Sequence, residues 1–243
     1  MKTNITHSVR EVIETLDKGI VISVSDFPEA VQSPKAVSLI LNALVSEGIL
    51  RKLSKGRFYK PETDKSGELQ PDTYQVIKDF LTKNGRLISY TTGHSVFKDL
   101  GLTAQEPDII QIGTRKDKRP IVRGSFRIHF LKQENIITAE NIPLLRILDC
   151  LRLFKTIPDT TPDTACQRLL QLVKDLNIQQ ISEIKELALN YTPQAIALLG
   201  AMLETLYQDE DIFALFSQLN PITDYKLSIS EKVLPVQKKW NIR

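Results

Sequence analysis

The apolar and polar residues between positions 33 and 60 follow two different periods. Over residues 34–47 apolar side chains recur every three or four positions, which predicts a helix with one buried face. The apolar positions are Val37, Ile40, Leu41 and Leu44. Ser33 can cap the first turn, Pro34 suits the first helical position, and Gly48 can end the helix in the left-handed conformation.

After Gly48 the pattern changes to two short strand-like runs, residues 49–53 and 57–60, joined through Ser54, Lys55 and Gly56. Gly56 permits the positive φ of a tight turn, so the two runs predict a β-hairpin. Residues 49–60 contain five Lys or Arg and no Asp or Glu. We therefore expect the hairpin to be strongly cationic.

The residues upstream complete a small domain. Residues 8–16 show one apolar helical stripe, residues 20–24 are a β-branched run, and Asp26 with Glu29 has the spacing of a capping box that opens a short helix. The predicted order is helix, strand, helix, helix, hairpin, as in a winged helix-turn-helix. The alternative is another small helix-hairpin domain whose basic residues are merely solvated.

A winged helix places one helix in the major groove of DNA and a hairpin along the backbone or minor groove. The polar side of the 34–47 helix and the cationic hairpin supply the candidate contacts. The predicted DNA-binding residues are Ser33, Lys35, Ser38, Asn42, Arg51, Lys52, Lys55 and Arg57.

Residues 61–71 are polar and contain Pro and Gly, which is typical of a linker. The chain then divides into a winged-helix domain, residues 1–61, and a second domain, residues 72–243. The second domain begins with a helix up to residue 81, followed by a further helix at 92–100 and strands at 109–114 and 125–131. Helical spacing then dominates; the predicted helices are 143–154, 162–176, 181–191 and 195–206.

A second basic loop lies between the two predicted strands. The loop ends with Arg123. The residues of the loop that are candidates for phosphate contacts are Arg115, Lys116, Lys118 and Arg119. The alternative is a hairpin tip that is only solvated.

The composition limits the classes of function. With 243 residues, 42% of them apolar, the chain can bury a sizeable core, and a net charge of +3 is too small for a nucleic-acid polycation. Cys150 and Cys166 have neither the spacing of a disulfide framework nor that of a zinc site, so we expect reduced core thiols. No signal peptide and no apolar run of roughly 18 residues is present, which predicts a soluble, cytoplasmic protein without a membrane partner.

Catalysis has weak support. The strongest pattern is that of a metal-dependent nuclease, with Glu106, Asp108 and Asp117 near predicted strands. The matching Glu183-Ile184-Lys185 motif falls on a predicted helix, however, and no Gly-rich phosphate loop is present. We therefore expect no catalytic residues, no metal and no cofactor.

Three stretches together carry a family resemblance: RKLSKGRFYKP, YTTGHSVFKDLGLTAQEPDIIQIGT, and LALNYTPQAIALLGAMLE followed by NPITDYKLSISEKVLP. With them the chain resembles the AbiEi-type antitoxins of abortive-infection (type IV) toxin–antitoxin systems. The resemblance implies a repressor of its own operon that binds double-stranded operator DNA, such as an inverted repeat. It also implies a C-terminal domain that counters a nucleotidyltransferase-like toxin.

The expected fold class is therefore α/β (α+β), with an N-terminal winged helix followed by a mixed α/β domain whose C-terminal part is helical. The expected function is that of a DNA-binding transcriptional regulator and antitoxin. The alternatives are a nuclease-like or other nucleic-acid-processing enzyme with a winged-helix targeting domain, or a protein-interaction module.

Overall fold

The structure is a computed structural model that describes residues 5–65, 67–207 and 211–243. The chain forms two compact units, each discontinuous in sequence. The first comprises the residues up to Phe80 together with Ile121–Arg127, and the second comprises Leu81–Pro120 and Ile128–Arg243. The chain therefore passes from one unit to the other three times.

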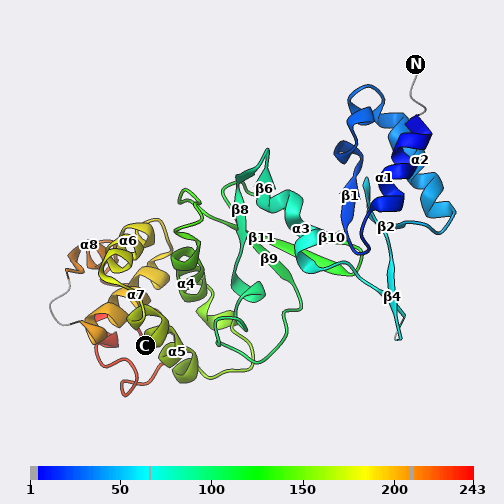
Figure 1. The fold of residues 1–243 in the computed structure, drawn as a ribbon. Coiled ribbons are helices and arrows are strands. Elements are labelled where there is room, and N and C mark those ends of the chain that lie inside the picture. The colour runs from blue at the N-terminus through cyan, green and yellow to red at the C-terminus, as the bar shows by residue number, and fades with distance from the viewer. Residues whose placement is uncertain (1–4, 66, 208–210) are drawn as a thin grey trace. The chain divides into compact units, whose positions relative to one another are not determined.

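The first unit begins with helices on a small sheet (Figure 1). Its elements are α1 (Ile5–Thr15), β1 (Val21–Ser23), the 3₁₀ turns η1 (Val24–Asp26) and η2 (Pro28–Val31), α2 (Pro34–Ser46), β2 (Arg51–Ser54) and β3 (Arg57–Tyr59). The three strands lie in the order β1-β3-β2, and both pairings are antiparallel. Phe58 of the central strand pairs with Ile22 on one side and with Lys52 on the other.

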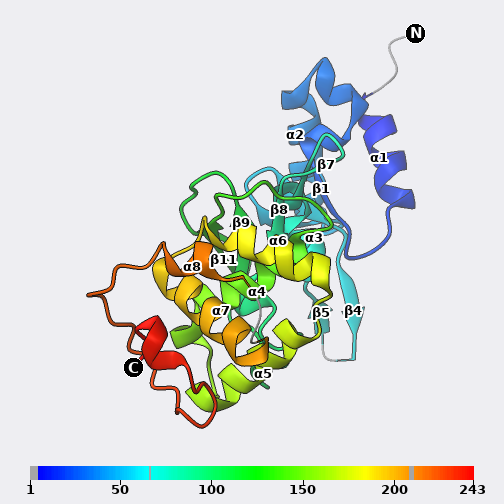
Figure 2. The ribbon, with the colours of Figure 1, turned by 90° about the vertical axis from the view of Figure 1, so that its left-hand side faces the viewer.

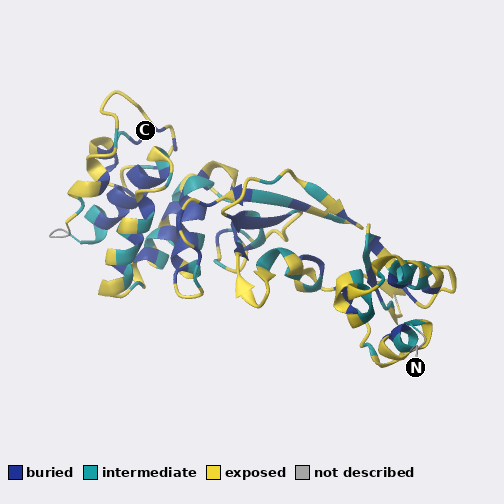
Figure 3. Ribbon diagram, turned by 90° about the horizontal axis from the view of Figure 1, so that it is seen from above, coloured by how far each residue is buried: buried dark blue, intermediate teal, exposed yellow. Residues whose placement is uncertain are grey.

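The core of this unit is built from one face of each helix and the inner side of the sheet. Val9 and Ile13 of α1 pack with the apolar stripe of α2 and with Phe58. Three stripe positions, Val37, Leu41 and Leu44, are almost completely buried, as the three-to-four spacing predicts. Figure 3 shows the same alternation, with dark buried and yellow exposed faces on these helices.

The helix ends differ in part from the prediction. Gly48 adopts the expected positive φ of 79° after α2. The Ser33 side chain, however, makes no capping hydrogen bond; its carbonyl oxygen instead accepts from the backbone N–H of Val37. The capping box predicted for Asp26 and Glu29 is also wrong, because Asp26 pairs with Ser23 and Glu29 accepts a hydrogen bond from Ser8.

The segment predicted as a linker, residues 61–71, contains an antiparallel hairpin of exposed residues, β4 (Glu62–Asp64) and β5 (Gly67–Leu69). The next element is helix α3 (Thr73–Leu81). All of its residues up to Phe80 belong to the first unit. The observed division thus differs from the predicted boundary, because most of this helix and the strand β10 (Ile121–Arg123) pack with the N-terminal elements.

The second unit combines a sheet with a helical part. Its first elements are β6 (Thr82–Lys83), β7 (Arg86–Leu87), β8 (Ser89–Thr91), the 3₁₀ turn η3 (Gly93–Ser95), β9 (Ile110–Thr114) and β11 (Phe126–Lys132), whose first residues belong to the first unit. The sheet order is β10-β11-β9-β8; β9 is parallel to β11 and antiparallel to β8. Gly113 of β9 is needed because a Cβ there would lie 2.5 Å from the Tyr90 ring on the neighbouring strand.

The helix predicted at 92–100 is wrong, because only the short turn η3 forms there. Gly93 has a positive φ of 54°, which a continuous helix does not allow. The segment is attached to β9 instead: Thr92 donates its backbone N–H to the carbonyl of Gln111, and His94 donates its own to the Gln111 side chain. Residues 92–94 and Gln111 are distant in sequence, so the local spacing of apolar residues could not predict these hydrogen bonds.

The helical part of the second unit agrees with the predicted pattern (Figure 2). Its elements are α4 (Ile142–Arg152), η4 (Phe154–Thr156), α5 (Pro162–Lys174), α6 (Ile178–Ala188), α7 (Pro193–Leu206), α8 (Phe213–Phe216) and η5 (Gln237–Trp240). Residues 195–203 of α7 are all buried, so this helix lies in the centre of the core. Trp240 packs directly on Gly200, where a Cβ would lie 2.1 Å from its ring.

Both cysteines are free and buried in this core, as predicted. Among the described residues, no helix is long and apolar enough to cross a membrane.

Candidate nucleic-acid interface

Helix α2 has one face in the core and another face in solvent. Opposite the buried Val37, Leu41 and Leu44, the side chain of Lys35 is exposed and Leu39 is 64% exposed. An apolar side chain that is two-thirds exposed on a helix is accessible to a partner. The accessible groups on this face thus include one cation, one aliphatic side chain and the exposed Ser46.

Asn42, predicted to contact DNA bases, is half-buried and already engaged within α2. Its side-chain amide donates to the backbone carbonyl oxygen of Ser38 at 2.6 Å, and the backbone carbonyl oxygen of Asn42 accepts from the hydroxyl of Ser46 at 3.3 Å. Bidentate pairing with adenine needs both the amide and the oxygen of an Asn side chain. In this conformation the amide of Asn42 is directed at Ser38, so pairing with adenine requires the Asn42 side chain to leave Ser38.

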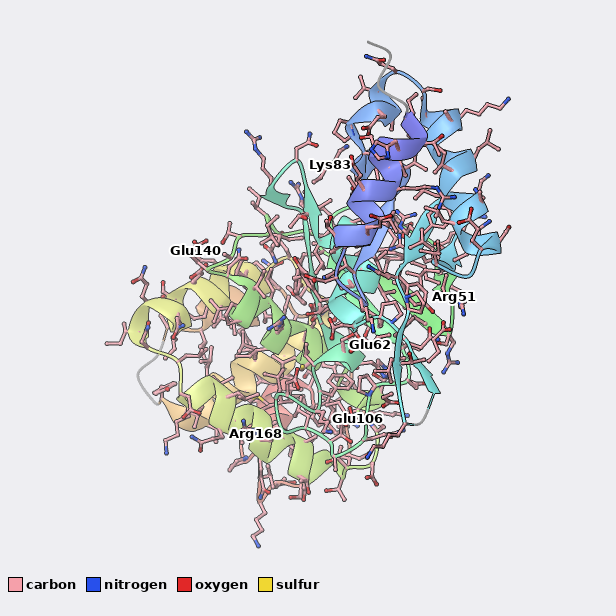
Figure 4. All side chains as sticks on the ribbon, turned by 45° about the vertical axis from the view of Figure 1, so that its right-hand side comes forward. Arg51, Glu62, Lys83, Glu106, Glu140 and Arg168 are labelled. Carbon is pink, nitrogen blue, oxygen red and sulfur yellow. The ribbon has the colours of Figure 1, made fainter. Side chains whose placement is uncertain are left out.

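The β2–β3 hairpin forms as predicted, but its four basic side chains differ in environment. Arg51 donates to Glu68 at 2.9 Å, and Arg57 forms an ion pair with Asp79. Lys52 and Lys55 are exposed and make no ion pair within the described part of the chain. Figure 4 labels Arg51 on this hairpin.

Asp79 also binds Arg123, and sequence analysis missed this interaction. The Arg123 side chain is 4% exposed; its two terminal nitrogens donate to the Asp79 carboxylate at 2.6 and 2.8 Å, and its guanidinium lies 4.1 Å from the centre of the Phe80 ring. Burial raises the pKa of Asp79, but the hydrogen bonds and charges of Arg123 and Arg57 outweigh it, and the pKa lies below its usual value. Arg123 therefore belongs to the core of the first unit and not to a phosphate-binding loop.

The second basic loop joins β9 to β10. It is not the hairpin tip considered as the alternative, because β9 and β11 are parallel. Arg115, Lys116 and Arg119 are exposed there, whereas Lys118 is half-buried with its ammonium 5.3 Å from the centre of the Phe130 ring. The loop remains a cationic surface of the second unit.

The acids considered for a nuclease lie apart from regular strands. Glu106, which Figure 4 labels, Asp108 and Asp117 are exposed loop residues, and Glu106 pairs with Lys98. Glu183 and Lys185 lie on α6, as predicted. Among the described residues, no group of three or more His, Cys, Asp and Glu side chains is suited to hold a metal ion.

A buried polar network in the second unit was not predicted. Asp149 of α4 is 1% exposed and accepts hydrogen bonds from the hydroxyls of Tyr90 at 2.6 Å, Thr92 at 2.7 Å and Tyr191 at 3.1 Å. The Gln133 amide donates to both tyrosine hydroxyls, at 2.9 and 2.7 Å. The only sequence signal was an acid within the apolar run of a predicted helix.

Burial dominates the electrostatics of this network. It raises the pKa of Asp149 to about 6, although the three hydroxyl donors and the charge of Arg152 act in the opposite direction. Burial together with the neighbouring carboxylate also raises the pKa of Tyr90 and of Tyr191. The network joins β8, the residue that follows β11, α4 and the turn before α7, so it fixes the sheet of the second unit to its helices.

The fold and these surfaces define an α+β protein with a small N-terminal helix–hairpin unit and a second unit of mixed sheet and helices. The chain belongs to a sequence family, described as a family of unknown function (DUF6088), which matches residues 8–181. No curated protein matches the chain.

A solved structure is similar to this chain over most of its length. It is described as the crystal structure of RV2827C protein from Mycobacterium tuberculosis, with a TM-score of 0.58 and 12% sequence identity. The alignment covers 94% of this chain and 86% of that chain. At this identity the likeness shows the fold, and the predicted α+β class is confirmed.

Proposed function

We propose that this protein is a cytoplasmic transcriptional regulator that binds double-stranded DNA with its first unit, built as a winged helix-turn-helix. The observation that best supports this proposal is the pairing, within one unit, of a helix with an exposed face and a hairpin with exposed cations. Helix α2 exposes Lys35 and Leu39, and the β2–β3 hairpin exposes Lys52 and Lys55. Helix and hairpin are the two elements with which winged helices bind the major groove and the adjacent backbone.

The hairpin then supplies affinity that does not depend on base sequence. Arg51 and Arg57 are already paired with Glu68 and Asp79, so the lysines are the cations available for phosphates. We therefore assign the contacts with the DNA backbone to Lys52 and Lys55. Arg51 and Arg57, which were also predicted to contact DNA, contribute less.

We further propose, from the resemblance to AbiEi-type antitoxins, that the DNA is the operator of the protein's own operon and that the protein counters a nucleotidyltransferase-like toxin. A gene for such a toxin next to this one, and growth rescue when the two are expressed together, are the expected results. Toxicity that persists in the presence of this protein would reject the antitoxin function and leave DNA binding to be tested separately.

DNA binding is tested by fluorescence anisotropy with the upstream region of the gene at several salt concentrations. Each neutralised phosphate contributes about 0.9 to the slope of log K against log salt, so Lys52→Ala/Lys55→Ala should flatten the slope by up to about 2 units per chain. Binding to specific and to unrelated DNA should weaken together.

The matched control is Lys155→Ala/Lys174→Ala, which removes two exposed lysines from the second unit. Its slope should equal that of the wild type. An unchanged slope in the hairpin variant, with a flattened slope after neutralisation of Arg115, Lys116, Lys118 and Arg119, would assign the phosphate contacts to the second basic loop instead.

A further inference from the structure

A polar pocket of about 240 Å³ opens in the second unit next to the Asp149 network. Three segments line it: residues 132–134 at the end of β11, Arg152 at the end of α4, and residues 190–192 before α7. The pocket is therefore built by elements that the buried network already holds in place.

Arg152 has unused hydrogen-bonding capacity. It is half-buried, and one terminal nitrogen donates to the carbonyl oxygen of Lys132 at 2.9 Å. A guanidinium has five N–H donors, and within the described part of the chain Arg152 makes no ion pair. Its charge lowers the pKa of Asp149, but that carboxylate takes its hydrogen bonds from three hydroxyls and none from Arg152.

Apart from the carboxylate of Glu134, the other lining groups suit an anion bound by Arg152. Lys132 adds a second cation, which at present pairs with Glu134 at 2.6 Å on the surface. Thr192 is exposed, and its side chain makes no capping bond to α7. The hydroxyl of Tyr191 points into the protein, toward Asp149, so the ring is the part of this side chain that is available to line the pocket.

The size of the pocket limits the ligand. Sites for drug-sized organic molecules usually measure about 300–1,000 Å³, so this pocket is suited to a small anion or to the anionic end of a larger molecule. Guanidinium groups bind phosphate through paired N–H donors, and an ammonium adds a point charge. We propose that the pocket binds a phosphate group, either free or as part of a small phosphorylated molecule such as a mononucleotide, through Arg152 and Lys132.

A second pocket of the same unit offers a comparison. It has a similar volume, about 250 Å³, and is also lined by two cationic side chains, here the lysines Lys155 and Lys226. Both of these are exposed, and no arginine lines that pocket. Exposed lysines alone are an ordinary solvated surface, so Lys155→Gln/Lys226→Gln is a control that removes one positive charge more than Arg152→Gln does.

The experiment is isothermal titration of the full-length protein with inorganic phosphate and with 5′-AMP, at constant ionic strength. We expect wild-type protein to bind, and Arg152→Gln to bind about tenfold or more weakly, the loss that follows removal of a charged donor. Lys155→Gln/Lys226→Gln should bind as the wild type does. Tighter binding of 5′-AMP than of phosphate would identify a nucleotide as the ligand, and equal binding would identify free phosphate.

A measurement on unmodified protein covers the case in which Arg152→Gln fails to fold. In ¹⁵N-labelled wild-type protein, phosphate should shift the amide resonances of residues 132–134 and 190–192. The proposal is overturned if neither probe binds, if the shifts fall elsewhere, or if the control variant loses as much affinity as Arg152→Gln.

Discussion

At the scale of single residues, Asp149 has the side-chain carboxyl group that is most completely shielded from solvent among the described residues. Its carboxylate is buried, and the three hydroxyls that donate to it do not offset the cost of burying the charge. The pKa of about 6 in the folded protein compares with an ordinary value of 3.8. Between these values the folded protein binds more protons than the unfolded chain, so stability falls as the pH rises from about 4 to about 6.

Asp149→Asn should remove this dependence. The amide oxygen can accept from Tyr90 and Thr92, and the amide nitrogen can donate to the oxygen of Tyr191, whose hydroxyl has an alternative acceptor in the Leu145 carbonyl at 3.3 Å. Relative to wild type, the free energy of unfolding of the variant should rise by roughly 2 kcal/mol between pH 4 and pH 7, since one pKa unit corresponds to about 1.4 kcal/mol and the unfolded carboxyl is already partly ionised at pH 4.

Urea unfolding followed by the fluorescence of Trp240, the single tryptophan of the chain, measures this in the second unit. Asp99→Asn, at an exposed position of the same unit, is the control and should leave the wild-type pH dependence intact. Parallel pH profiles for wild type and Asp149→Asn would show that Asp149 is charged throughout this range.

At the scale of elements, the sequence predicted what local spacing determines and missed what distant contacts determine. Helices α4 to α7 lie close to the predicted ranges because their apolar stripes recur every three or four residues. The segment 92–100 has helix-like composition but is held to β9 by Gln111. Arg123 looked like part of a basic loop because nothing local links it to Asp79, 44 positions away.

The same contrast applies to the candidate interface. The exposed face of α2 was predictable from periodicity, and Lys35 lies on it as expected. The hydrogen bond from Asn42 to Ser38 depends on a side-chain rotamer, which the pattern of residue types does not specify. Leu39 was not among the predicted contacts, because an exposed leucine has no polar group.

These contacts lead to a prediction about base preference, which rests on the proposed DNA binding. Lys35→Ala should relax selection for guanine, and Leu39→Ala should relax selection for thymine, whose methyl group prefers apolar contacts. Asn42→Ala should change the preference less than either. A binding-site selection assay on the three variants compares them, and a loss of adenine preference confined to Asn42→Ala would show that this side chain leaves Ser38 when it binds DNA.

At the scale of the whole molecule, the first unit is not a single stretch of chain. Residues 121–127 return to it from the second unit, and the return is anchored by Arg123, which binds Asp79 and the carbonyl of Val76 and covers Phe80. All three partners lie on α3, within the N-terminal stretch of this unit. The stability of α3 should therefore depend on a residue that follows it by more than forty positions.

Arg123→Met tests this dependence, because it keeps most of the apolar stem and removes the charge. Asp79 is partly exposed and retains Arg57, so the expected loss is roughly 2 kcal/mol, the value of hydrogen bonds to a charged group, and not that of a fully buried ion pair. Hydrogen exchange followed by mass spectrometry should show faster exchange in α3, while α4 to α7 keep their protection. Arg119→Met, an exposed position of the second unit, should leave both unchanged. Faster exchange throughout α4 to α7 in Arg123→Met would instead mean that the two units open together, so that residues 121–127 stabilise the whole molecule and not the first unit alone.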